Sequence, residues 1–300
     1  MPPPAQRPPS PRAASASPPA GGTAGDPPTT SGRWSTHGVE VAADRVTKRF
    51  LPGSGGRAER EWRALTLLSV YAPGLAPEPL AAELDAERPV VVMSRLPGDP
   101  LRDAALGTEQ LDALAAALTA LHSAVPPEAL GALPPRPGRP SALRPHLDRW
   151  AAEVRPRTGG AVRQAVDAGL GWLARSAPDD GDRAGLPAAF GPGDGNLANY
   201  LWDGARVRAV DFEESGRSDR AFEIAEITEH VSAWATCPLD VPALLARLDL
   251  TPAETARLRA CRRLLALVWL FLLAQDDPAN PRNPPGTAER QAARLLELLG

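Results

Sequence analysis

Two carboxylates and one carboxamide have the types and spacing that point most directly to chemistry in this chain: Asp194, Asn199 and Asp211. Between them, Asp203-Gly204 is a strong signal for a two-residue hairpin turn, whose central positions need positive φ angles. A turn at this dipeptide pairs residue 199 with residue 208, so Asp211 returns beside the loop that carries Asp194. Mg²⁺ prefers carboxylate, amide and phosphate oxygens. The block therefore predicts a magnesium site, although Asp and Asn are also common as ordinary turn residues.

The same spacing resembles the catalytic block of the protein-kinase-like fold, where a catalytic Asp is followed by Asn and then by Asp-Phe-Gly. Here Gly193-Asp194, Asp211-Phe212 and residues 216–219 resemble the aminoglycoside phosphotransferase family and its relatives acting on choline and sugars. The resemblance implies an α+β, bilobal protein-kinase-like fold. We expect a small, β-rich and shortened N-terminal lobe over residues 34–97, which binds the nucleotide. A mainly helical C-terminal lobe with the catalytic and metal loops is expected over residues 98–300.

A lysine and a glutamate near the N-terminal side fit the same fold. Residues 38–51 predict two short strands, with Lys48 on the second, and a helix pattern follows a Gly-rich loop. Glu61 shares the apolar stripe of that helix, where an unpaired carboxylate is costly. Kinase-like folds hold a strand lysine with a helix glutamate. The resemblance therefore assigns these roles to Lys48 and Glu61, with Glu59 as a competitor and a solvated surface pair as the alternative.

A further hairpin is predicted over residues 79–95, followed by a Pro-Gly break that resembles the inter-lobe hinge of the family. Backbone groups left unpaired at such a break can bind the edge of adenine. We therefore expect nucleotide contacts from four residues: Met93, Ser94, Arg95 and Leu96. The alternative is an edge strand that leads into a helix. His122, at the end of the next apolar helix, is expected to pack or cap rather than to catalyse.

The resemblance implies a role for each residue of the central block. Asp194 accepts or orients the proton of the acceptor hydroxyl, while Asn199 and Asp211 hold Mg²⁺ on the β- and γ-phosphates. Lys48 fixes the α- and β-phosphates, and Asn196 steadies the loop or the γ-phosphate. ATP is the expected nucleotide, with GTP not excluded. The expected acceptor is a hydroxyl group of a small molecule, either an aminoglycoside-like antibiotic or a metabolite.

Several acidic residues follow the Asp-Phe pair, and they bear on which molecule accepts the phosphate. A polycationic aminoglycoside needs a binding site with an acidic wall. Glu213 and Glu214 are the first candidates for this wall, and four more carboxylates follow: Asp219, Glu223, Glu226 and Glu229. A solvated helix face is the alternative, and Asp219 is also suited to capping the segment after the metal loop.

Three departures weaken the match to the family pattern, and two of them, Pro192 and the shortened N-terminal part, favour a second hypothesis. Pro192 stands where the family usually has His, Glu213 stands where protein kinases have Gly, and few residues precede Val39 to form a first strand. A non-catalytic kinase-like protein that binds a ligand or partner would tolerate these changes. We favour the enzyme because the base and metal residues are all present.

Composition narrows the remaining possibilities. Residues 1–33 contain ten prolines and no aromatic residue, so we expect a disordered extension. The net charge of −3 argues against a nucleic-acid or anionic-membrane binder. The two cysteines have no motif spacing, and the apolar run at 264–274 is shorter than the ~20 residues of a membrane helix. We expect a cytoplasmic protein with a buried helix at 264–274 and no protein partner.

Overall fold

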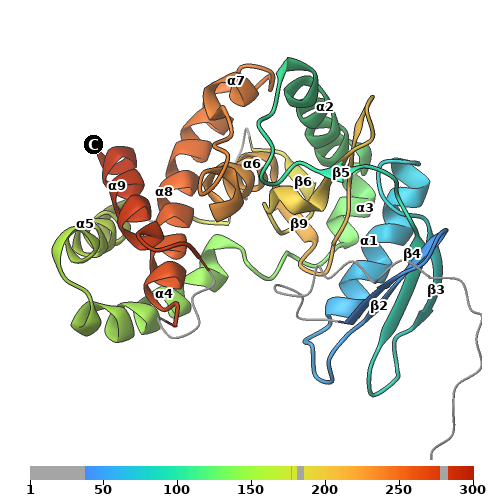
Figure 1. Cartoon of the computed structure of the whole chain (residues 1–300), viewed down its shortest axis with the longest axis horizontal. Coiled ribbons are helices and arrows are strands. Elements are labelled where there is room, and N and C mark those ends of the chain that lie inside the picture. Colours follow the sequence, from blue (N-terminus) through green and yellow to red (C-terminus); the bar gives the residue numbers. More distant parts are fainter. Residues whose placement is uncertain (1–37, 177, 181–185, 278–282) are drawn as a thin grey trace, which may run out of the picture. The chain divides into compact units, whose positions relative to one another are not determined.

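The computed structural model describes residues 38–176, 178–180, 186–277 and 283–300 (Figure 1). The extension predicted over residues 1–33 and the short stretch up to residue 37 lie outside this part of the chain. An antiparallel sheet comes first and a mainly helical part follows, so the predicted α+β class is confirmed. The proposed lobe boundary at residues 97 and 98 stays a prediction.

The N-terminal sheet contains both predicted hairpins. Its order is β1-β2-β4-β3, with every neighbouring pair antiparallel. The strands are β1 (Gly38–Val41), β2 (Arg45–Arg49), β3 (Pro79–Glu83) and β4 (Val90–Ser94). Helix α1 (Arg57–Tyr71) connects β2 to β3 and buries Leu65 and Leu68. The apolar stripe read from the sequence is therefore the buried face of α1, and it carries Glu61 inward.

Two small sheets hold the central block. One has the order β5-β7-β8, and the other pairs β6 with β9. Their bounds are β5 (Asp99–Pro100), β6 (Ala188–Gly191), β7 (Tyr200–Trp202), β8 (Val207–Ala209) and β9 (Gly216–Asp219). The loop with Asp194 follows β6, and the loop with Asp211 lies between β8 and β9.

The hairpin at Asp203 has a longer loop than predicted. Arg208 pairs with Leu201 instead of residue 199, so four residues, 203–206, connect the strands. The Asp203 carboxylate accepts two backbone N–H groups inside this loop, at 2.9 and 3.0 Å. These local hydrogen bonds stabilise the longer turn and shift the register by two residues.

Helices make up most of the remaining chain. They are α2 (Thr108–Ala124), α3 (Pro127–Ala132), α4 (Pro140–Val154), α5 (Gly160–Ser176), α6 (Arg220–Glu229), α7 (Val241–Leu245), α8 (Pro252–Ala274) and α9 (Thr287–Leu299). Short 3₁₀ turns are η1 (Arg155–Arg157), η2 (Leu197–Asn199) and η3 (Val231–Ala233). Helix α8 packs against α4, α5, α6 and α9 (Figure 1), and most of its apolar run is buried as predicted, with Leu272 exposed. In the described ranges, none of the helices has the length and apolar character needed to cross a bilayer.

Candidate active site

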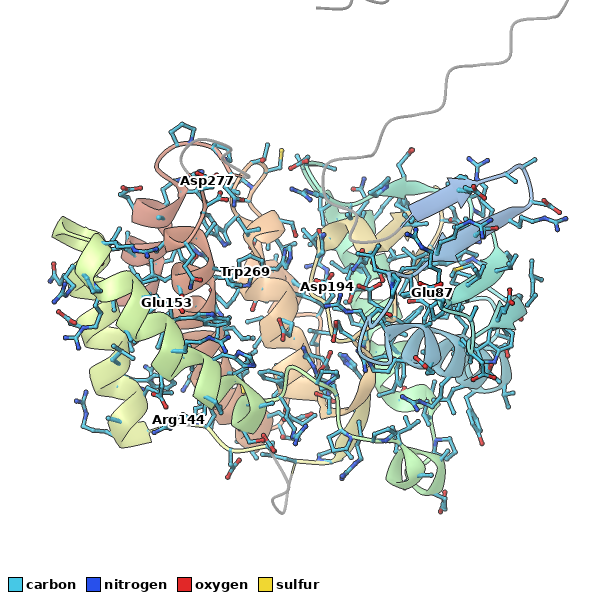
Figure 2. All side chains as sticks on the ribbon, turned by 90° about the horizontal axis from the view of Figure 1, so that it is seen from below. Glu87, Arg144, Glu153, Asp194, Trp269 and Asp277 are labelled. Atoms are coloured by element: carbon cyan, nitrogen blue, oxygen red, sulfur yellow. The ribbon has the colours of Figure 1, made fainter. Side chains whose placement is uncertain are left out.

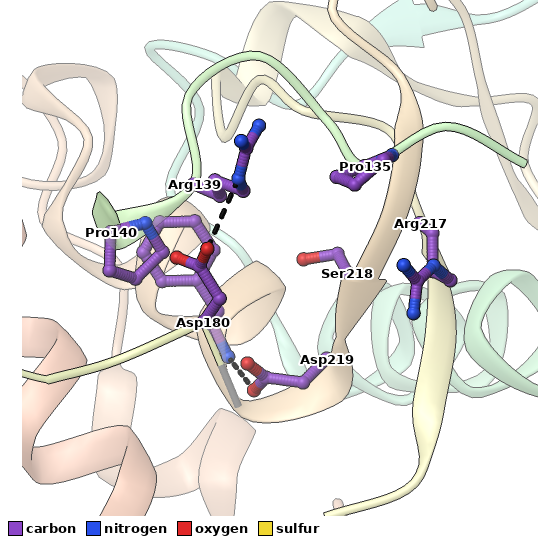
Figure 3. Close-up of a pocket in the computed structure, with 8 residues that line it drawn as sticks. Pro135, Arg139, Pro140, Asp180, Arg217, Ser218 and Asp219 are labelled. Atoms are coloured by element: carbon purple, nitrogen blue, oxygen red, sulfur yellow. Dashed lines mark hydrogen bonds and ion pairs between the residues drawn. The ribbon is translucent and has the colours of Figure 1, made fainter. Parts of the chain in front are cut away.

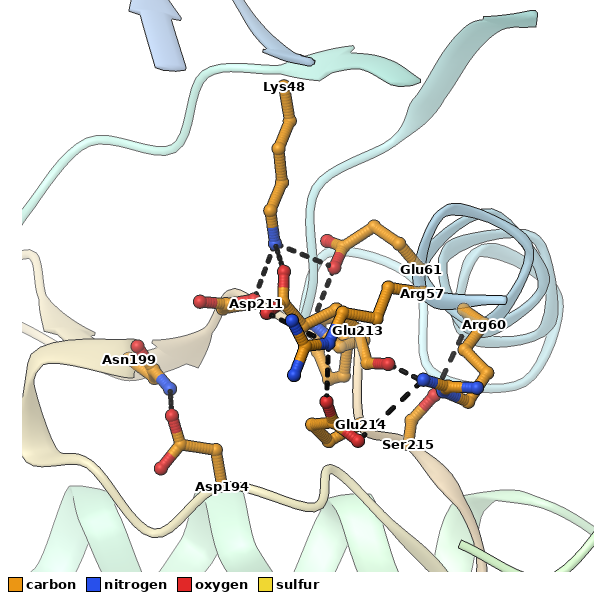
Figure 4. Close-up of polar contacts among 11 residues, drawn as sticks. Lys48, Arg57, Arg60, Glu61, Asp194, Asn199, Asp211, Glu213, Glu214 and Ser215 are labelled. Atoms are coloured by element: carbon orange, nitrogen blue, oxygen red, sulfur yellow. Dashed lines mark hydrogen bonds and ion pairs between the residues drawn. The ribbon is translucent and has the colours of Figure 1, made fainter. Parts of the chain in front are cut away.

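Lys48 reaches from β2 into a cluster of carboxylates (Figure 4). Its Nζ atom lies 3.3 Å from Glu61 Oε2, 2.6 Å from Asp211 Oδ1 and 2.5 Å from Glu213 Oε2. Burial acts to lower the pKa of Lys48, but the three carboxylates outweigh it and the pKa is raised. The ammonium is therefore held in its charged form at the junction of sheet, helix and metal loop.

Glu61 connects α1 to two other segments. Its Oε2 atom contacts Lys48 and also accepts the backbone N–H of Phe212 at 2.9 Å. The residue is fully buried, and burial raises its pKa while Lys48 opposes the rise. Glu61 rather than Glu59 is thus the carboxylate that meets Lys48. The nucleotide-binding roles of both residues stay predictions.

Asp211 has an unusual backbone conformation. Its φ angle is 71°, in the left-handed region that Asp and Asn tolerate better than most residues. Asp211 follows Val210, whose N–H donates to the Asn199 carbonyl at 2.9 Å. The two predicted metal ligands are therefore brought together by the hairpin, despite its shifted register.

Asp194 lies in a loop stabilised by side chains of the loop itself. Its Oδ1 atom accepts the N–H of Asn196 at 3.0 Å, and its Oδ2 atom accepts Nδ2 of Asn199 at 3.1 Å. Asn196 Oδ1 accepts the N–H of Ala198 at 3.1 Å and so caps η2. Asn196 therefore steadies the loop, which is one of its two expected roles.

The Asp194 carboxylate is half-buried and is labelled in Figure 2. Burial raises its pKa, and the charge of Asp211 adds to the rise, while the hydrogen bonds from Asn196 and Asn199 lower it. A carboxylate with a raised pKa is a better proton acceptor near neutral pH. This environment suits a general base.

The donor chemistry of this region fits Mg²⁺. Asn199 turns its Nδ2 toward Asp194, which leaves its Oδ1 as a ligand atom, and Asp211 contributes a half-exposed carboxylate. Oxygen atoms of Glu61, Asp211 and Glu213 also lie within 4.8 Å of one another. Carboxylate and carboxamide oxygens are the ligands that a hard divalent cation prefers.

Arg136 is a residue of this region that the sequence reading missed. It lies in the proline-rich connector before α4 and is 3% exposed. Its guanidinium donates to Glu223 Oε1 at 2.9 Å, to Glu226 Oε1 at 2.8 Å and to the carbonyl of Gly193 at 2.8 Å. Glu223 Oε2 accepts the N–H of Gly193 at 3.2 Å. Both backbone groups next to Asp194 are therefore held by one buried network.

The glycines on either side of Asp194 are required by close packing. Gly193 has a φ of 89°, and a Cβ atom there would lie 2.1 Å from the Glu214 carbonyl oxygen. A Cβ atom on Gly195 would lie 2.2 Å from the Glu226 carbonyl group. The loop with Asp194 thus sits directly against the metal loop and α6.

Glu213 and Glu214 point toward α1 instead of forming an open wall. Glu213 contacts Lys48, and Glu214 Oε1 lies 2.7 Å from Arg57 Nε (Figure 4). Arg60 lies 3.7 Å from Glu214 Oε2 and donates to the Glu213 carbonyl at 2.6 Å. Cations of the protein itself compensate both charges, so the acidic wall expected here gains no support.

The other four acidic residues also have arginine partners. Glu223 and Glu226 bind Arg136, as described above. Glu229 is fully buried between Arg262, at 2.6 Å, and Arg294, at 3.0 Å. Asp219 binds Arg257 at 3.0 Å and accepts the N–H of Phe222 at 2.9 Å. The capping alternative for Asp219 is therefore the observed one.

Asp219 also lines a small pocket beside β9 (Figure 3). The pocket holds about 50 Å³ and is bordered by the ion pair of Arg139 with Asp180, at 3.1 Å. Ligand pockets of drug-sized molecules hold ~300 Å³ or more. This pocket therefore has room for water molecules and not for a nucleotide.

Part of the predicted adenine-binding segment already forms backbone contacts within the N-terminal part of the protein. Met93 lies on the central strand β4, paired with Val46 and Pro79. The Ser94 N–H donates to Glu78 O, and the Arg95 N–H donates to Asp44 O, both at 2.9 Å. The N–H groups of Ser94 and Arg95 are therefore already bonded within the protein, and the adenine-binding role of residues 93–96 stays a prediction.

The amino-acid sequence of α6 contained the signal that would have found the buried network. Its apolar residues Ala221, Phe222, Ile224, Ala225 and Ile227 span more than one face of the helix, and all five are buried. So wide an apolar face predicts a buried helix, whose glutamates then need partners. The long sequence separation hid Arg136, which lies 87 residues from Glu223.

Comparison with known proteins gives one family and one fold. A family model described as the phosphotransferase enzyme family matches residues 30–264. No curated protein matches the chain in sequence.

Among solved structures, a thermostable mutant of aminoglycoside phosphotransferase APH(4)-Ia is 19% identical, with a TM-score of 0.59 and coverage of 87% of this chain and 88% of that chain. A choline/ethanolamine kinase family protein from Mesorhizobium loti is 20% identical, with a TM-score of 0.56 and coverage of 87% and 84%. A ternary complex of an APH(4)-Ia mutant with AMP-PNP and hygromycin B is 18% identical, with a TM-score of 0.56 and coverage of 90% and 95%. These similarities show a shared kinase-like fold.

Proposed function

Because the chain belongs to the phosphotransferase enzyme family, we propose that it transfers the γ-phosphate of ATP to a hydroxyl group of a small molecule. The observation that carries this proposal is that Lys48 Nζ lies within 3.3 Å of carboxylate oxygens of both Glu61 and Asp211. In the same site, Asp194 accepts a hydrogen bond from the Asn199 side chain. These are the parts that phosphoryl transfer requires, since it depends on positioning and charge neutralisation. Mg²⁺ and a cytoplasmic location are part of the proposal.

Each residue of the site has its own role in the proposed reaction. The acceptor oxygen forms a bond to the γ-phosphorus, the bond from that phosphorus to the β–γ bridging oxygen breaks, and ADP leaves. Asp194 receives the hydroxyl proton. Lys48, held by Glu61, binds the α- and β-phosphates. Asn199 and Asp211 would hold Mg²⁺, which when bound neutralises charge on the β- and γ-phosphates.

The acceptor is best described by its reacting group. The named similar structures include one with hygromycin B and one of a choline/ethanolamine kinase family protein, so family members differ in acceptor. The arginine partners of the acidic residues remove the argument for a polycation. We therefore propose a hydroxylated antibiotic or metabolite without requiring several positive charges.

A non-catalytic binding protein remains the second candidate, because one observation favours it. Three carboxylates surround Lys48 Nζ, at 2.5, 2.6 and 3.3 Å, so phosphate oxygens must compete for the ammonium. A pocket that had lost turnover could keep this closed arrangement.

Calorimetric titration with AMP-PNP, with and without Mg²⁺, tests the proposal. We expect binding that depends on Mg²⁺ and that Asp211→Asn abolishes, since this substitution removes the charge but tolerates the left-handed backbone. Asp194→Asn should bind AMP-PNP like the wild type but lose ATP turnover. No binding at millimolar nucleotide would contradict the proposal and favour the second candidate.

A further inference from the structure

A histidine that the sequence reading left without a role lies beside Asp194. His230 follows α6 and is 8% exposed. Its Nε2 atom lies 3.7 Å from Asp194 Oδ1. The ring of Trp269, on α8, packs edge-on against the imidazole with centroids 4.6 Å apart, and Figure 2 labels this tryptophan. Helix α8 thus fixes the imidazole next to the predicted base.

The hydrogen bonds of His230 determine its tautomer. Its Nδ1 atom accepts the backbone N–H of Ser232 at 3.0 Å and lies 2.7 Å from the Ser232 hydroxyl oxygen. That hydroxyl oxygen accepts the N–H of Leu197 at 2.9 Å, so its own proton is available for Nδ1. An Nδ1 atom that accepts a backbone N–H carries no proton. In a neutral imidazole the proton is therefore on Nε2, which faces Asp194.

The ring stays neutral over the working pH range. Burial lowers the pKa of His230 to about 3, and the positive charge of Arg102 adds to this effect. Asp194 is the acidic group that faces the ring, at 3.7 Å. The site therefore presents a fixed N–H donor rather than an imidazolium.

We propose that His230 is a positioning residue whose Nε2–H donates to Asp194 Oδ1, so that Oδ2 is the oxygen that receives the acceptor proton. A carboxylate offers about two lone pairs on each oxygen. Oδ1 already accepts the Asn196 N–H, and the His230 N–H would occupy its second lone pair. Oδ2 accepts only the Asn199 amide among the described contacts, which leaves one lone pair for the substrate.

The distance and the neighbouring sequence agree with this role. A separation of 3.7 Å is longer than a hydrogen bond, but catalytic hydrogen bonds are often long before substrate binds and then tighten. Pro192 cannot donate through a side chain where the family usually has His. His230 would supply a donor to the same loop from a different element.

The test rests on the proposed function and uses ATP with water as the phosphate acceptor. His230→Phe keeps an aromatic ring but removes the donor, whereas His230→Gln retains an N–H near the Nε2 position. We expect His230→Phe to lower kcat by about tenfold or more, with AMP-PNP affinity unchanged, because the base is no longer held. His230→Gln should largely restore kcat.

An equal loss of kcat in both variants would overturn the positioning role. Nitrogen-15 NMR of histidine-labelled protein gives an independent readout, because the chain has four histidines. We expect the Nε2–H tautomer for His230 at pH 6–8 and a shift of its Nε2 resonance in Asp194→Asn. An Nδ1–H tautomer would refute the inference whatever the activity. A wild type that neither binds AMP-PNP nor hydrolyses ATP would refute the proposed function, and the NMR result alone would then decide whether His230 contacts Asp194.

Discussion

The substitution Arg136→Met removes the guanidinium that compensates two buried glutamates on α6. Arg136 is 3% exposed and Glu223 is 2% exposed, so solvent cannot take over the role of the lost partner. Removing one member of a buried ion pair costs about 3–5 kcal/mol. We therefore expect the free energy of unfolding at pH 8 to fall by about 4 kcal/mol.

The loss should depend on pH in a predictable direction. Burial raises the pKa of Glu226 to about 7 even with Arg136 present, compared with an ordinary value of 4.5. Without the guanidinium the pKa rises further, so the folded variant takes up protons that the unfolded chain releases. Stability of the variant therefore falls as pH rises from about 4.5 through the raised pKa. The difference from the wild type should be smaller at pH 5.5 than at pH 8.

Urea unfolding followed by tryptophan fluorescence measures this effect at both pH values. Arg139→Met is the matched control, because its ion pair with Asp180 is partly solvated, with side chains 39% and 30% exposed. We expect that control to lose less than about 1 kcal/mol. Adding Glu223→Gln and Glu226→Gln to Arg136→Met should recover part of the stability. A loss below about 1 kcal/mol at pH 8, or an equal loss at both pH values, would refute the reasoning.

Three further predictions concern single side chains. Gly193→Ala should lower both the free energy of unfolding and ATP turnover, because its Cβ would collide with the Glu214 carbonyl group. Gly204 has a φ of 96° and no atom within 4 Å of an added Cβ. Gly204→Ala should therefore lower the free energy of unfolding, measured by chemical denaturation, by only the ~1–2 kcal/mol that a left-handed backbone costs. His122 is buried with both ring nitrogens unpaired among the described residues, and burial lowers its pKa to about 4. The free energy of unfolding of the wild type should therefore fall by about 3 kcal/mol from this histidine as pH falls from 6.5 to 4. Urea unfolding of His122→Leu should not show this contribution. Glu213→Gln should tighten AMP-PNP binding several-fold in calorimetry, because Glu213 Oε2 lies 2.5 Å from Lys48 Nζ and competes with phosphate. Unchanged affinity would show that Glu213 moves away without cost.

The sequence was informative where a function depends on local spacing. Lys48 on a strand and Glu61 on an apolar helix face were identified because strand and helix periodicities are local. The hairpin between Asn199 and Asp211 was recognised, but its register was off by two residues, since the Asp203 side chain stabilises a longer loop.

Residues that act across the chain could not be found in this way. Arg136 lies in a proline-rich connector with no periodic pattern, and its partners are 57 to 90 residues away. The partners of Glu213 and Glu214 lie more than 150 residues upstream, so a run of acidic residues gave no hint that α1 would compensate it. Charge pairing between distant segments is a property of the folded chain, which one sequence does not reveal.

The pairing of the α6 glutamates with arginines also affects the order of events during folding. Its glutamates receive their arginines from remote segments: Arg136 upstream, and Arg262 and Arg294 downstream. Helix α6 can form early from local contacts, but its charges resist burial until α8 and α9 have docked. Contacts of such long sequence separation close slowly. We therefore expect α6 to pack late and together with both C-terminal helices, so a chain interrupted before α9 would hold Glu229 with only one of its two cations.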